Sequence, residues 1–452
     1  MTGIYVVSRY TPEECLSKAI AAQKGEFQES TATTGDEIIL DESSERNDAW
    51  DDFNHPRRRR ALILQEFNRR KNINGANIEF EAPAITSRGS EDENNQEIIR
   101  LGMYRKVHSE GLIEFLCTAW RGWESLGQKG RDPSCIPFSS LVLEDPDDQE
   151  HPLRVPPLIP CNFAFPRDNN NFHQHHPQRR SQNVMGQIGY YCTDTCTPIV
   201  AELLEELEHD QEIVCRAVDI ASDSRNDGLV YALCTHPGHH ASNDSFGGYC
   251  YVNNAALVAR LLQEQLADKN NPTPKVAILD VDYHCGNGTA SIFYDDPSVL
   301  VVSIHCHPDF EYPFHAGFGD ETGGPNAEAC TLHIPLLPGA QWNDDYQTAL
   351  QSAGDAIENF GPDALVVSLG LDTHAEDPCA TRRAGFLLGS NDSDYDCMGR
   401  AIGSIVTSCS SSNNIRSIPT IVLQEGGYKM DAVPIAAADV VLGIAATKST
   451  TS

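Results

Sequence analysis

Two carboxylates and one imidazole alternate in the run Asp280-Val-Asp282-Tyr-His284, which directly follows an apolar segment. If that segment is a strand that continues through the run, the three side chains project from one face, because strand side chains alternate. A single aspartate there would be explained as a cap of the next loop. Three such side chains in register instead predict a row of metal ligands, and carboxylates with imidazole suit Zn²⁺ or Fe²⁺.

A further aspartate follows another apolar segment, in the run Gly370-Leu-Asp372-Thr-His374. Asp372 could supply a third ligand from a neighbouring strand and leave one coordination position open to water. Such a centre lowers the pKa of water and polarises a carbonyl group, and both effects favour hydrolysis. His374 could lie near the metal or belong to an ordinary loop.

Adjacent histidines stand in the run His236-Pro-Gly-His239-His240. An imidazole with a pKa of about 6.5 can take a proton from water and return it to a leaving amine. Each ring needs a partner that orients its far nitrogen, and Asp280 and Asn287 are available in the next loop. The pair therefore predicts a general base and acid beside the aspartates.

A tyrosine follows the last apolar segment, in the run Gln424-Glu425-Gly426-Gly427-Tyr428. The two glycines let the backbone pass close beneath a site and present the phenol to it. A phenol next to a polarised carbonyl can donate a hydrogen bond to the oxyanion that develops there, which is typically worth about 2.7–4 kcal/mol. A core tyrosine after a Gly-Gly turn is the alternative.

Apolar runs rich in Val, Ile and Leu precede these four polar runs, and a similar run lies between them. They indicate strands buried on both faces, as in a parallel sheet covered by helices. We therefore predict an α/β fold with its site at the carboxyl ends of the strands. The predicted strands are Leu229–Leu233, Val276–Leu279, Val299–Ile304, Ala364–Leu369 and Pro419–Leu423.

The first 185 residues alternate short periodic segments with polar stretches, and we treat residues 1–452 as a single domain with long loop insertions. The predicted elements are a strand over Ile4–Tyr10 and helices over Arg57–Asn68 and Glu114–Trp123. The predicted loops are 11–52, 131–184 and a flexible tail at 446–452. The second loop holds three histidines that we interpret as solvated, because no acidic or cysteine ligand stands beside His173, His175 and His176.

The 452-residue chain has 33 Lys and Arg against 65 Asp and Glu, so its formal net charge is −32 at pH 7. Binding to a nucleic acid needs a net supply of cationic side chains, so this class of partner is excluded. Acidic side chains either favour a cationic partner or only keep the chain in solution. Most of the acidity lies outside the polar runs, in the segments 28–52, 88–97, 144–150 and 201–228.

No apolar run reaches the roughly 18 residues that span a bilayer. The first 36 residues lack the pattern of a signal peptide. The 15 cysteines are an odd number without paired spacings, which is typical of reduced thiols. Cys192 and Cys196 form one close pair, a weak indication of a metal or redox site. We expect an intracellular protein of the cytoplasm or nucleus, with no membrane partner.

Together, these runs resemble the metal-dependent histone deacetylase superfamily. The superfamily motifs are Gly238-His239-His240-Ala241, Gly247-Gly248-Tyr249-Cys250-Tyr251, Asp280-x-Asp282-x-His284-x-Gly-Asn287, Gly370-x-Asp372-Thr and Glu425-Gly-Gly-Tyr428. A narrower resemblance to the acetylpolyamine amidohydrolases rests on Trp120-Arg-Gly-Trp123, Gly186-Gln-Ile-Gly-Tyr-Tyr-Cys192, and His307-Pro308 followed by Tyr312-Pro-Phe314. It extends from about Asn54 to Ala445 and implies an arginase/deacetylase-type parallel sheet flanked by helices.

The resemblance implies that Zn²⁺, or Fe²⁺ in its place, is bound by Asp282, His284 and Asp372. His240 would be the general base and acid, with His239 as an electrostatic companion held by Asp280. Tyr428 would polarise the carbonyl group. Asn287 stands where many members have an aspartate behind the second histidine, and it gives less support to an imidazolium.

The resemblance also assigns a substrate tunnel lined by Tyr249 and Tyr312, with Gly248 at its rim. Family members commonly hold K⁺ near the catalytic metal as a structural ion. The corresponding backbone and side-chain atoms here belong to Asp280, Asp282, His284, Ser303 and Ile304. A second potassium site would fall near Phe293, Asp296 and Val299.

Several features depart from the family pattern. The polyamine enzymes carry acidic residues that face a cationic substrate at two positions where this chain has Met185 and Cys196. Asp194 lies close by, but side-chain alternation would turn it differently. Cys285 stands where a second histidine is usual, which leaves the ligand spacing intact. The 131–184 segment is longer than in the bacterial enzymes, where it builds a dimer contact and narrows the tunnel mouth, so a homodimer and the exclusion of protein substrates stay open.

Three functions are open on these residues. The first is a zinc-dependent amidohydrolase, a deacetylase that hydrolyses an acetylpolyamine or a similar small cation. The second is a protein lysine deacetylase acting on acetyl-lysine, which the loss of the two acidic positions favours because a neutral mouth could accept a main chain. The third is an inactive module that binds acyl-amines, which the complete ligand set and Tyr428 disfavour.

Overall fold

The computed structural model describes residues 3–14, 56–74, 77–83, 100–128, 157–163, 180–223, 226, 229–381, 385–391, 393–412 and 417–449. Most of the predicted insertions at 11–52 and 131–184 lies outside these residues, as do His173, His175 and His176. The last helix continues to Ser449, so the segment predicted as a tail at 446–452 begins as helix.

Eight strands lie in the described chain: β1 (Ile4–Ser8), β2 (Ile78–Glu81), β3 (Leu229–Leu233), β4 (Val276–Asp280), β5 (Val299–Cys306), β6 (Thr331–Leu336), β7 (Ala364–Leu369) and β8 (Thr420–Gln424). They form one sheet in the order β2-β1-β3-β8-β7-β4-β5-β6. Every neighbouring pair is parallel. The predicted α/β fold with a parallel sheet is confirmed.

The apolar character of the central strands follows from cores on both faces of the sheet. Along β3, Leu229, Tyr231 and Leu233 pack into one core, while Val230 and Ala232 pack into the other. Because successive strand side chains alternate, a strand between two helical layers must be apolar at nearly every position. β3, β4, β5, β7 and β8 are accordingly buried along their whole length.

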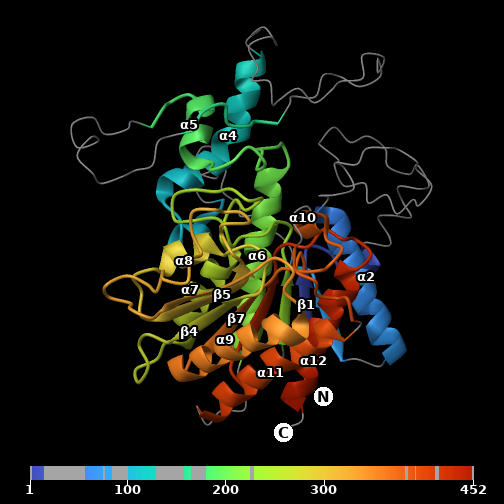
Figure 1. Cartoon of the computed structure of the whole chain (residues 1–452). Helices are drawn as coiled ribbons and strands as arrows, with labels where there is room; N and C mark the ends of the chain where they lie inside the picture. Colours follow the sequence, from blue (N-terminus) through green and yellow to red (C-terminus); the bar gives the residue numbers. More distant parts are fainter. Residues whose placement is uncertain are drawn as a thin grey trace.

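Helices cover both faces of this sheet (Figure 1). One face is covered by α2 (Pro56–Asn74), α9 (Gln347–Phe360), α11 (Asp394–Ser412) and α12 (Val433–Ser449). The other is covered by α6 (Leu203–Ser222), α7 (Asn254–Leu266) and α8 (Asn287–Phe293). Beyond α6, at the top of Figure 1, lie α4 (Glu110–Gln128) and α5 (Val184–Tyr191). Shorter elements are the 3₁₀ turn Gly102–Lys106, the π-helical turn Trp342–Tyr346 and α10 (Pro378–Thr381).

The edge strands and several element ends differ from the sequence prediction. The prediction missed β2 and β6, which lie at the two edges of the sheet and are only partly buried. Such strands need no continuous apolar run, and an edge position also tolerates Pro335 within β6. β1 ends at Ser8 instead of Tyr10, and α2 and α4 both extend beyond their predicted spans. Helix and strand ends carry weaker patterns than their centres.

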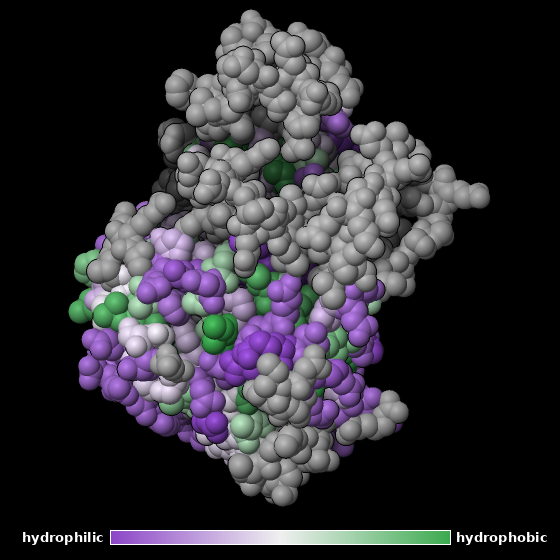
Figure 2. Space-filling view, turned by 90° about the vertical axis from the view of Figure 1, so that its right-hand side faces the viewer, coloured by the Kyte–Doolittle hydropathy of each residue, from purple (hydrophilic) through white to green (hydrophobic). Residues whose placement is uncertain are grey.

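The surface of the described residues is mainly hydrophilic on the face shown in Figure 2, with apolar side chains scattered between polar ones. Exposed large apolar residues include Phe163, Phe310, Leu337 and Ile435, from separate parts of the chain. Scattered apolar side chains of this kind are normal on a globular surface. No helix among the described residues combines the length and the apolarity that crossing a membrane requires.

Candidate active site

The carboxyl ends of four adjacent strands carry the polar runs. β3, β8, β7 and β4 are neighbours in the sheet, and the segments after them hold His240, Tyr428, Asp372 and Asp282, respectively. Because the strands are all parallel, these four segments meet at one edge of the sheet. The fold therefore brings together side chains that lie far apart in the sequence.

Asp282, His284 and Asp372 form a buried cluster whose ligand atoms all lie within 4.8 Å of one another. The Nδ1 atom of His284 lies 3.1 Å from Oδ2 of Asp372 and 3.3 Å from Oδ1 of Asp282. The predicted row of three ligands along one strand is wrong, because β4 ends at Asp280. Asp282 and His284 reach the cluster from the following loop, and Asp280 does not belong to it.

The donor set of this cluster fits a divalent cation. Burial and the charge of Asp282 raise the pKa of Asp372, since the two carboxylates are close together in a buried place. A cation would remove this repulsion, and carboxylates with imidazole are ligands of Zn²⁺. Gly370 and Gly426 leave the space that the carboxylates occupy, because a Cβ at either position would press against a carboxylate oxygen.

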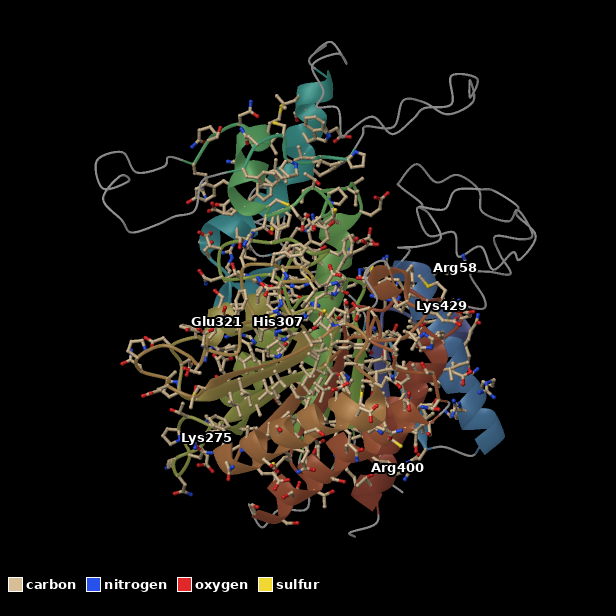
Figure 3. The ribbon with its side chains drawn as sticks, viewed as in Figure 1. Arg58, Lys275, His307, Glu321, Arg400 and Lys429 are labelled. Atoms are coloured by element: carbon tan, nitrogen blue, oxygen red, sulfur yellow. The ribbon has the colours of Figure 1, made fainter. Side chains whose placement is uncertain are left out.

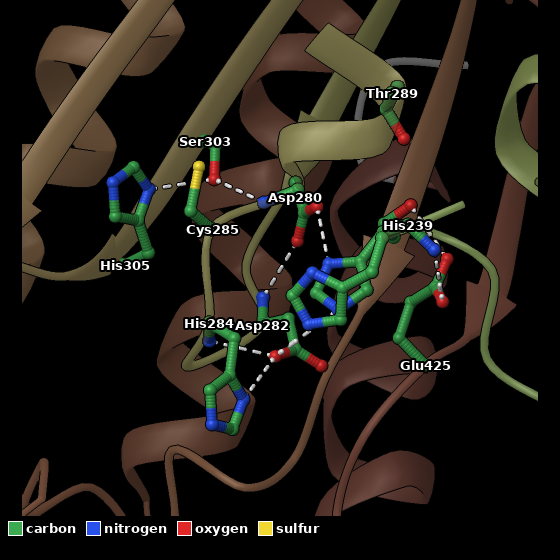
Figure 4. Close-up of polar contacts among 12 residues, drawn as sticks. His239, Asp280, Asp282, His284, Cys285, Thr289, Ser303, His305 and Glu425 are labelled. Atoms are coloured by element: carbon green, nitrogen blue, oxygen red, sulfur yellow. Dashed lines mark hydrogen bonds and ion pairs between the residues drawn. The ribbon is translucent and has the colours of Figure 1, made fainter. Parts of the chain in front are cut away.

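The surroundings of His239 favour its charged imidazole. Its Nδ1 donates to Oδ2 of Asp280 at 2.9 Å, and its Nε2 lies 3.8 Å from Oδ1 of Asp282 (Figure 4). Burial alone would lower the pKa of His239, but the charges of Asp282 and Asp280 raise it to about 10. A cation bound to Asp282 would offset part of this effect.

His240 is held as a neutral imidazole. Its Nδ1 donates to Oδ1 of Asn287 at 2.7 Å, which leaves the lone pair on Nε2. Burial and the charges of His239 and His284 lower the pKa of His240 well below its usual value. The two adjacent histidines therefore have opposite protonation preferences, although their ring centroids are only 4.0 Å apart.

Tyr428 is fixed by two buried residues that the sequence prediction did not single out. Oδ2 of Asp377 accepts hydrogen bonds from the backbone N–H groups of Tyr428 and Lys429, at 2.6 and 3.0 Å. Arg59, on α2, donates to the carbonyl oxygen of Gly427 at 3.0 Å, and its guanidinium lies 5.6 Å from the centre of the Tyr428 ring. An Asp-Pro pair typical of a turn is the only local sign of Asp377.

Glu425 fixes the turn that carries the two histidines. Its Oε2 atom accepts hydrogen bonds from the backbone N–H groups of Gly238 and His239, at 2.6 and 3.3 Å, and its Oε1 accepts from Ser368 at 3.0 Å. Burial raises the pKa of Glu425 to about 7. The sequence prediction used this residue only as part of a motif and gave it no role.

A cavity of about 460 Å³ opens onto this site. Its lining includes both histidines, the three members of the Asp/His/Asp cluster, Tyr428, and the predicted tunnel residues Gly248, Tyr249 and Tyr312. The ring of Tyr312 meets that of His240 edge-on at a centroid distance of 4.7 Å. Gly248 has a φ of +57°, and a side chain there would collide with the His240 ring.

Two carboxylates line the cavity away from the cluster, namely Asp194 and Glu311. Asp194 is fully engaged: its oxygens accept from the backbone N–H groups of Cys196 and Gly248 and from the hydroxyl of Thr197. Glu311 accepts one hydrogen bond, at 3.1 Å, from the backbone N–H of the adjacent Tyr312. Cys196 also lines the cavity, whereas Met185 is not among the lining residues.

The residues predicted for potassium lie in two separate places. Asp280, the last residue of β4, is the register partner of Ser303 in β5, and Ile304 follows on β5. At the other end of β5, the N–H of Asp296 donates to the carbonyl oxygen of Phe293 at 3.0 Å. The N–H of Val299 in turn donates to the carbonyl oxygen of Asp296 at 3.3 Å. Potassium at either place stays a prediction.

Two other candidate positions take no part in the cluster. The ring of His374 stacks on that of Tyr395, and its Nδ1 accepts the N–H of Glu376 at 3.1 Å. Cys192 is buried and its thiol donates to the carbonyl oxygen of Asp194 at 3.2 Å, while Cys196 is exposed. Within the described ranges, no third metal ligand lies beside these two cysteines.

Gly426 provides a steric test of the cluster. Its N–H donates to Oδ2 of Asp282 at 2.9 Å, and a Cβ would lie 2.7 Å from that oxygen and against the carboxylate of Asp372. We expect Gly426→Ala to lower metal affinity about 10–100-fold, the range typical for disturbing groups that orient metal ligands. Competition with a chelator measures the affinity.

Gly102→Ala is the matched control, because a Cβ at Gly102 meets no atom within 4 Å. Thermal unfolding of both variants would separate a local effect from loss of the fold. Unchanged metal affinity in Gly426→Ala would show that the metal does not bind between these carboxylates.

One cavity brings together the Asp/His/Asp cluster, the imidazole of His240 and the buried phenol of Tyr428. This combination is typical of metal-dependent hydrolases. Residues 73–444 match the family model described as histone deacetylase domain. The chain is 38% identical over 339 residues to acetylpolyamine amidohydrolase 1 of Pseudomonas aeruginosa, covering 75% of this chain and 81% of that protein. It is 35% identical over 342 residues to acetylpolyamine amidohydrolase 2 of the same organism, with the same two coverages.

A similar fold is present in the crystal structure of acetylpolyamine aminohydrolase from Burkholderia pseudomallei. The two structures superpose with a TM-score of 0.66 over 99% of each chain, at 22% sequence identity. The chain belongs to the histone deacetylase family. It is a deacetylase that hydrolyses C–N bonds of linear amides.

Proposed function

We propose that this deacetylase acts on an acetylated small cationic amine, most simply an acetylpolyamine. One observation carries the proposal: the cavity that holds the Asp/His/Asp cluster, His240 and Tyr428 also exposes Glu311, with Asp194 in the same lining. The names of the Pseudomonas relatives agree with this substrate class. The two carboxylates place acidic groups in the cavity lining although the positions of Met185 and Cys196 are not acidic.

Asp282, His284 and Asp372 would hold the catalytic cation, with Zn²⁺ as the first candidate and Fe²⁺ as the second. When bound there, the cation would polarise the amide carbonyl and lower the pKa of water. Gly370 and Gly426 keep the ligand carboxylates in place by leaving room for them. The fit rests on the donor set and on the repulsion between the two carboxylates.

His240 would move the protons of the reaction. Its Nε2 carries a lone pair because Nδ1–H donates to Asn287, so it can accept a proton from the attacking water. The same nitrogen then returns the proton to the nitrogen of the leaving amine. The ring centroid of His239 lies 4.0 Å from that of His240, and Asp280 accepts a hydrogen bond from His239. In its charged form, His239 would stabilise the negative charge that develops on the substrate.

Tyr428 would donate a hydrogen bond to the oxyanion of the tetrahedral intermediate. Burial raises the pKa of its phenol well above the usual value, so the hydroxyl keeps its proton for donation. Asp377 and Arg59 fix the backbone of this residue, which limits the reorganisation needed during the reaction. Tyr249 and Tyr312 would line the tunnel for the methylene chain, with Gly248 at its rim.

Substrate turnover tests the proposal directly. The zinc-loaded protein should hydrolyse acetylputrescine and acetylspermidine faster than peptides that carry acetyl-lysine. Turnover of acetyl-lysine peptides alone, undiminished as the peptide is lengthened on both sides, would overturn it in favour of a protein deacetylase. A protein that hydrolyses none of these amides but still binds them would be an acyl-amine binding module.

Potassium at the two predicted sites is best tested by comparing the hydrolysis rate in KCl with the rate in NaCl.

Glu311 should determine the preference for charged substrates. We expect Glu311→Gln to lower kcat/KM for acetylspermidine about 1.4- to fivefold, because one partly exposed ion pair is worth about 0.2–1 kcal/mol. The effect should shrink as salt is added. A neutral acetylated alkylamine should be hydrolysed at an unchanged rate, and the two substrates are compared by steady-state kinetics.

Asp309→Asn is the matched control for this variant. Asp309 lies two positions away, is exposed, and is not among the residues that line the cavity. Its replacement should leave both rates unchanged. An equal loss for the charged and the neutral substrate in Glu311→Gln would mean that Glu311 acts through the shape of the loop and not through its charge.

A further inference from the structure

A second group of metal-ligating side chains lies outside the cavity. Cys285, His305 and His333 are all buried, and the cysteine sulfur and one nitrogen of each imidazole lie within 4.8 Å of one another. Cys285 is in the loop after β4, while the histidines belong to the neighbouring strands β5 and β6. Figure 4 shows Cys285 and His305 next to Ser303, across Asp280 from the catalytic histidines.

The hydrogen bonds of His305 direct one lone pair into this group. Its Nε2–H donates to the carbonyl oxygen of Gly317 at 2.9 Å, so the lone pair of the neutral ring lies on Nδ1. That nitrogen accepts a hydrogen bond from the hydroxyl of Ser303 at 2.8 Å, beside the sulfur of Cys285. Burial is the main cause that lowers the pKa of His305 to about 3, which favours the neutral ring. A neutral imidazole is the form that binds a metal.

His333 points at the same cysteine from β6. Its Nδ1 lies 3.8 Å from Sγ of Cys285, and its Nε2 lies 3.6 Å from Oε2 of Glu321. Figure 3 labels Glu321, which lies on the α8 and β5 side of the molecule. Burial lowers the pKa of His333, so this ring is neutral too. A carboxylate or carbonyl group behind each histidine is the usual support of a metal ligand.

The spacing of the group suits a tetrahedral ion. Bonds of about 2.3 Å to sulfur and about 2.0–2.1 Å to nitrogen place these two ligand atoms roughly 3.5 Å apart. The sulfur of Cys285 and Nδ1 of His333 are 3.8 Å apart. Gly317 borders the group with a φ of +101°, and a Cβ there would lie 2.7 Å from Nε2 of His305 and 2.8 Å from the sulfur. A glycine at this position therefore lets the loop pass close to the donor atoms.

We propose that Cys285, His305 and His333 bind a second metal ion, Zn²⁺, at a structural site. One thiolate with two imidazoles is a ligand set that Zn²⁺ prefers, and a water completes it. A sulfur–zinc bond replaces the S–H bond of Cys285, and the released proton passes to water. The ion joins the loop after β4 to β5 and β6. Because Cys285 follows His284 directly, the bound ion also fixes the loop that supplies Asp282 and His284 to the catalytic cluster.

Cobalt substitution distinguishes the two sites by their donor atoms. The chelator-treated full-length protein is reloaded with Co²⁺, and its near-ultraviolet absorption and metal content are measured. We expect two ions per chain and a thiolate-to-cobalt charge-transfer band, because Asp282, His284 and Asp372 contain no sulfur. Cys285→Ser should lose the band and one ion. Asp372→Asn should weaken the other site and retain the band, so failure of either site is recognised separately.

Two cysteines of the cavity provide the matched controls. Cys196 and Cys379 line the cavity that holds the Asp/His/Asp cluster, so they test whether a thiol of that cavity produces the band. Cys196→Ser and Cys379→Ser should keep the band. A wild type that binds a single Co²⁺ without the band, or a band that persists in Cys285→Ser, would overturn the proposal.

Thermal unfolding gives an independent measurement if Cys285→Ser folds poorly. The Tm of the chelator-treated wild type should rise with added Zn²⁺ in two steps, one for each ion bound per chain. His333→Gln should show only one of these steps. A rise that saturates at one ion in the wild type would count against the second site.

Discussion

His240→Ala should lower kcat about 10²–10⁴-fold, the usual contribution of a positioned general acid or base. Nε2 of this ring is the nitrogen that carries a free lone pair in the cavity, because Nδ1–H donates to Asn287 at 2.7 Å. Without it, neither deprotonation of water nor protonation of the leaving amine has a donor or acceptor in place. Steady-state kinetics with acetylputrescine measures the loss.

The metal content of His240→Ala should be unchanged, because His240 is not a member of the Asp/His/Asp cluster. His209→Ala, at a partly exposed position on α6, controls for removal of a histidine as such and should keep full activity. A His240→Ala protein that retains bound metal and near wild-type kcat would refute the assignment of the general base.

Tyr428→Phe should lower kcat about 10²–10³-fold, the range observed when one oxyanion donor is removed. The variant keeps the ring that packs against Arg59 and Tyr249 and loses only the hydroxyl. The effect should therefore fall on kcat much more than on KM. The measurement is kcat and KM for acetylputrescine, with bound metal determined on the same preparation.

Tyr346→Phe is the matched control for Tyr428→Phe. Tyr346 is also buried and donates a hydrogen bond to the carbonyl oxygen of Val281, but it does not line the cavity. It should change stability by about 1 kcal/mol and leave kcat alone. Comparable kcat losses in both variants would indicate that a buried hydroxyl matters only for packing, and the proposed oxyanion donor would have to be sought elsewhere.

The polar runs at strand ends could be predicted because they combine two local signals. A near-continuous apolar run such as Val276–Asp280 indicates a strand covered on both faces, and Asp282 and His284 follow it within four residues. Parallel strands place their carboxyl ends at one edge. Those two facts are enough to bring Asp282, His284, Asp372, His240 and Tyr428 into one candidate site.

The partners that hold the site could not be predicted in the same way. Asp377 fixes Tyr428 from 51 positions away, and Glu425 fixes the His239 turn from 186 positions away. Neither contact leaves a periodic pattern, because a single carboxylate that accepts backbone hydrogen bonds can come from any loop that passes close by. The role of Arg59 could not be predicted either, because a basic residue on a helix is usually exposed to solvent.

The charge of the molecule shows the same division. Sequence alone gives a net charge of −32, excludes nucleic acid as a partner and locates most of the acidity in segments outside the polar runs. The family resemblance adds that this chain has Met185 and Cys196 at the two positions where the polyamine enzymes carry acidic residues. Only the fold shows that Glu311 and Asp194 line the cavity instead.

Sequence by itself determined the parallel α/β fold, the family motifs and the types of the reacting side chains, because periodicity and motif spacing are local properties of the chain. The tertiary structure decided which of these side chains share one cavity, that β4 ends at Asp280, and that Cys285, His305 and His333 converge on its other side. Such convergence depends on strand order and on loop paths. Both are set by the packing of the whole sheet and not by any segment alone.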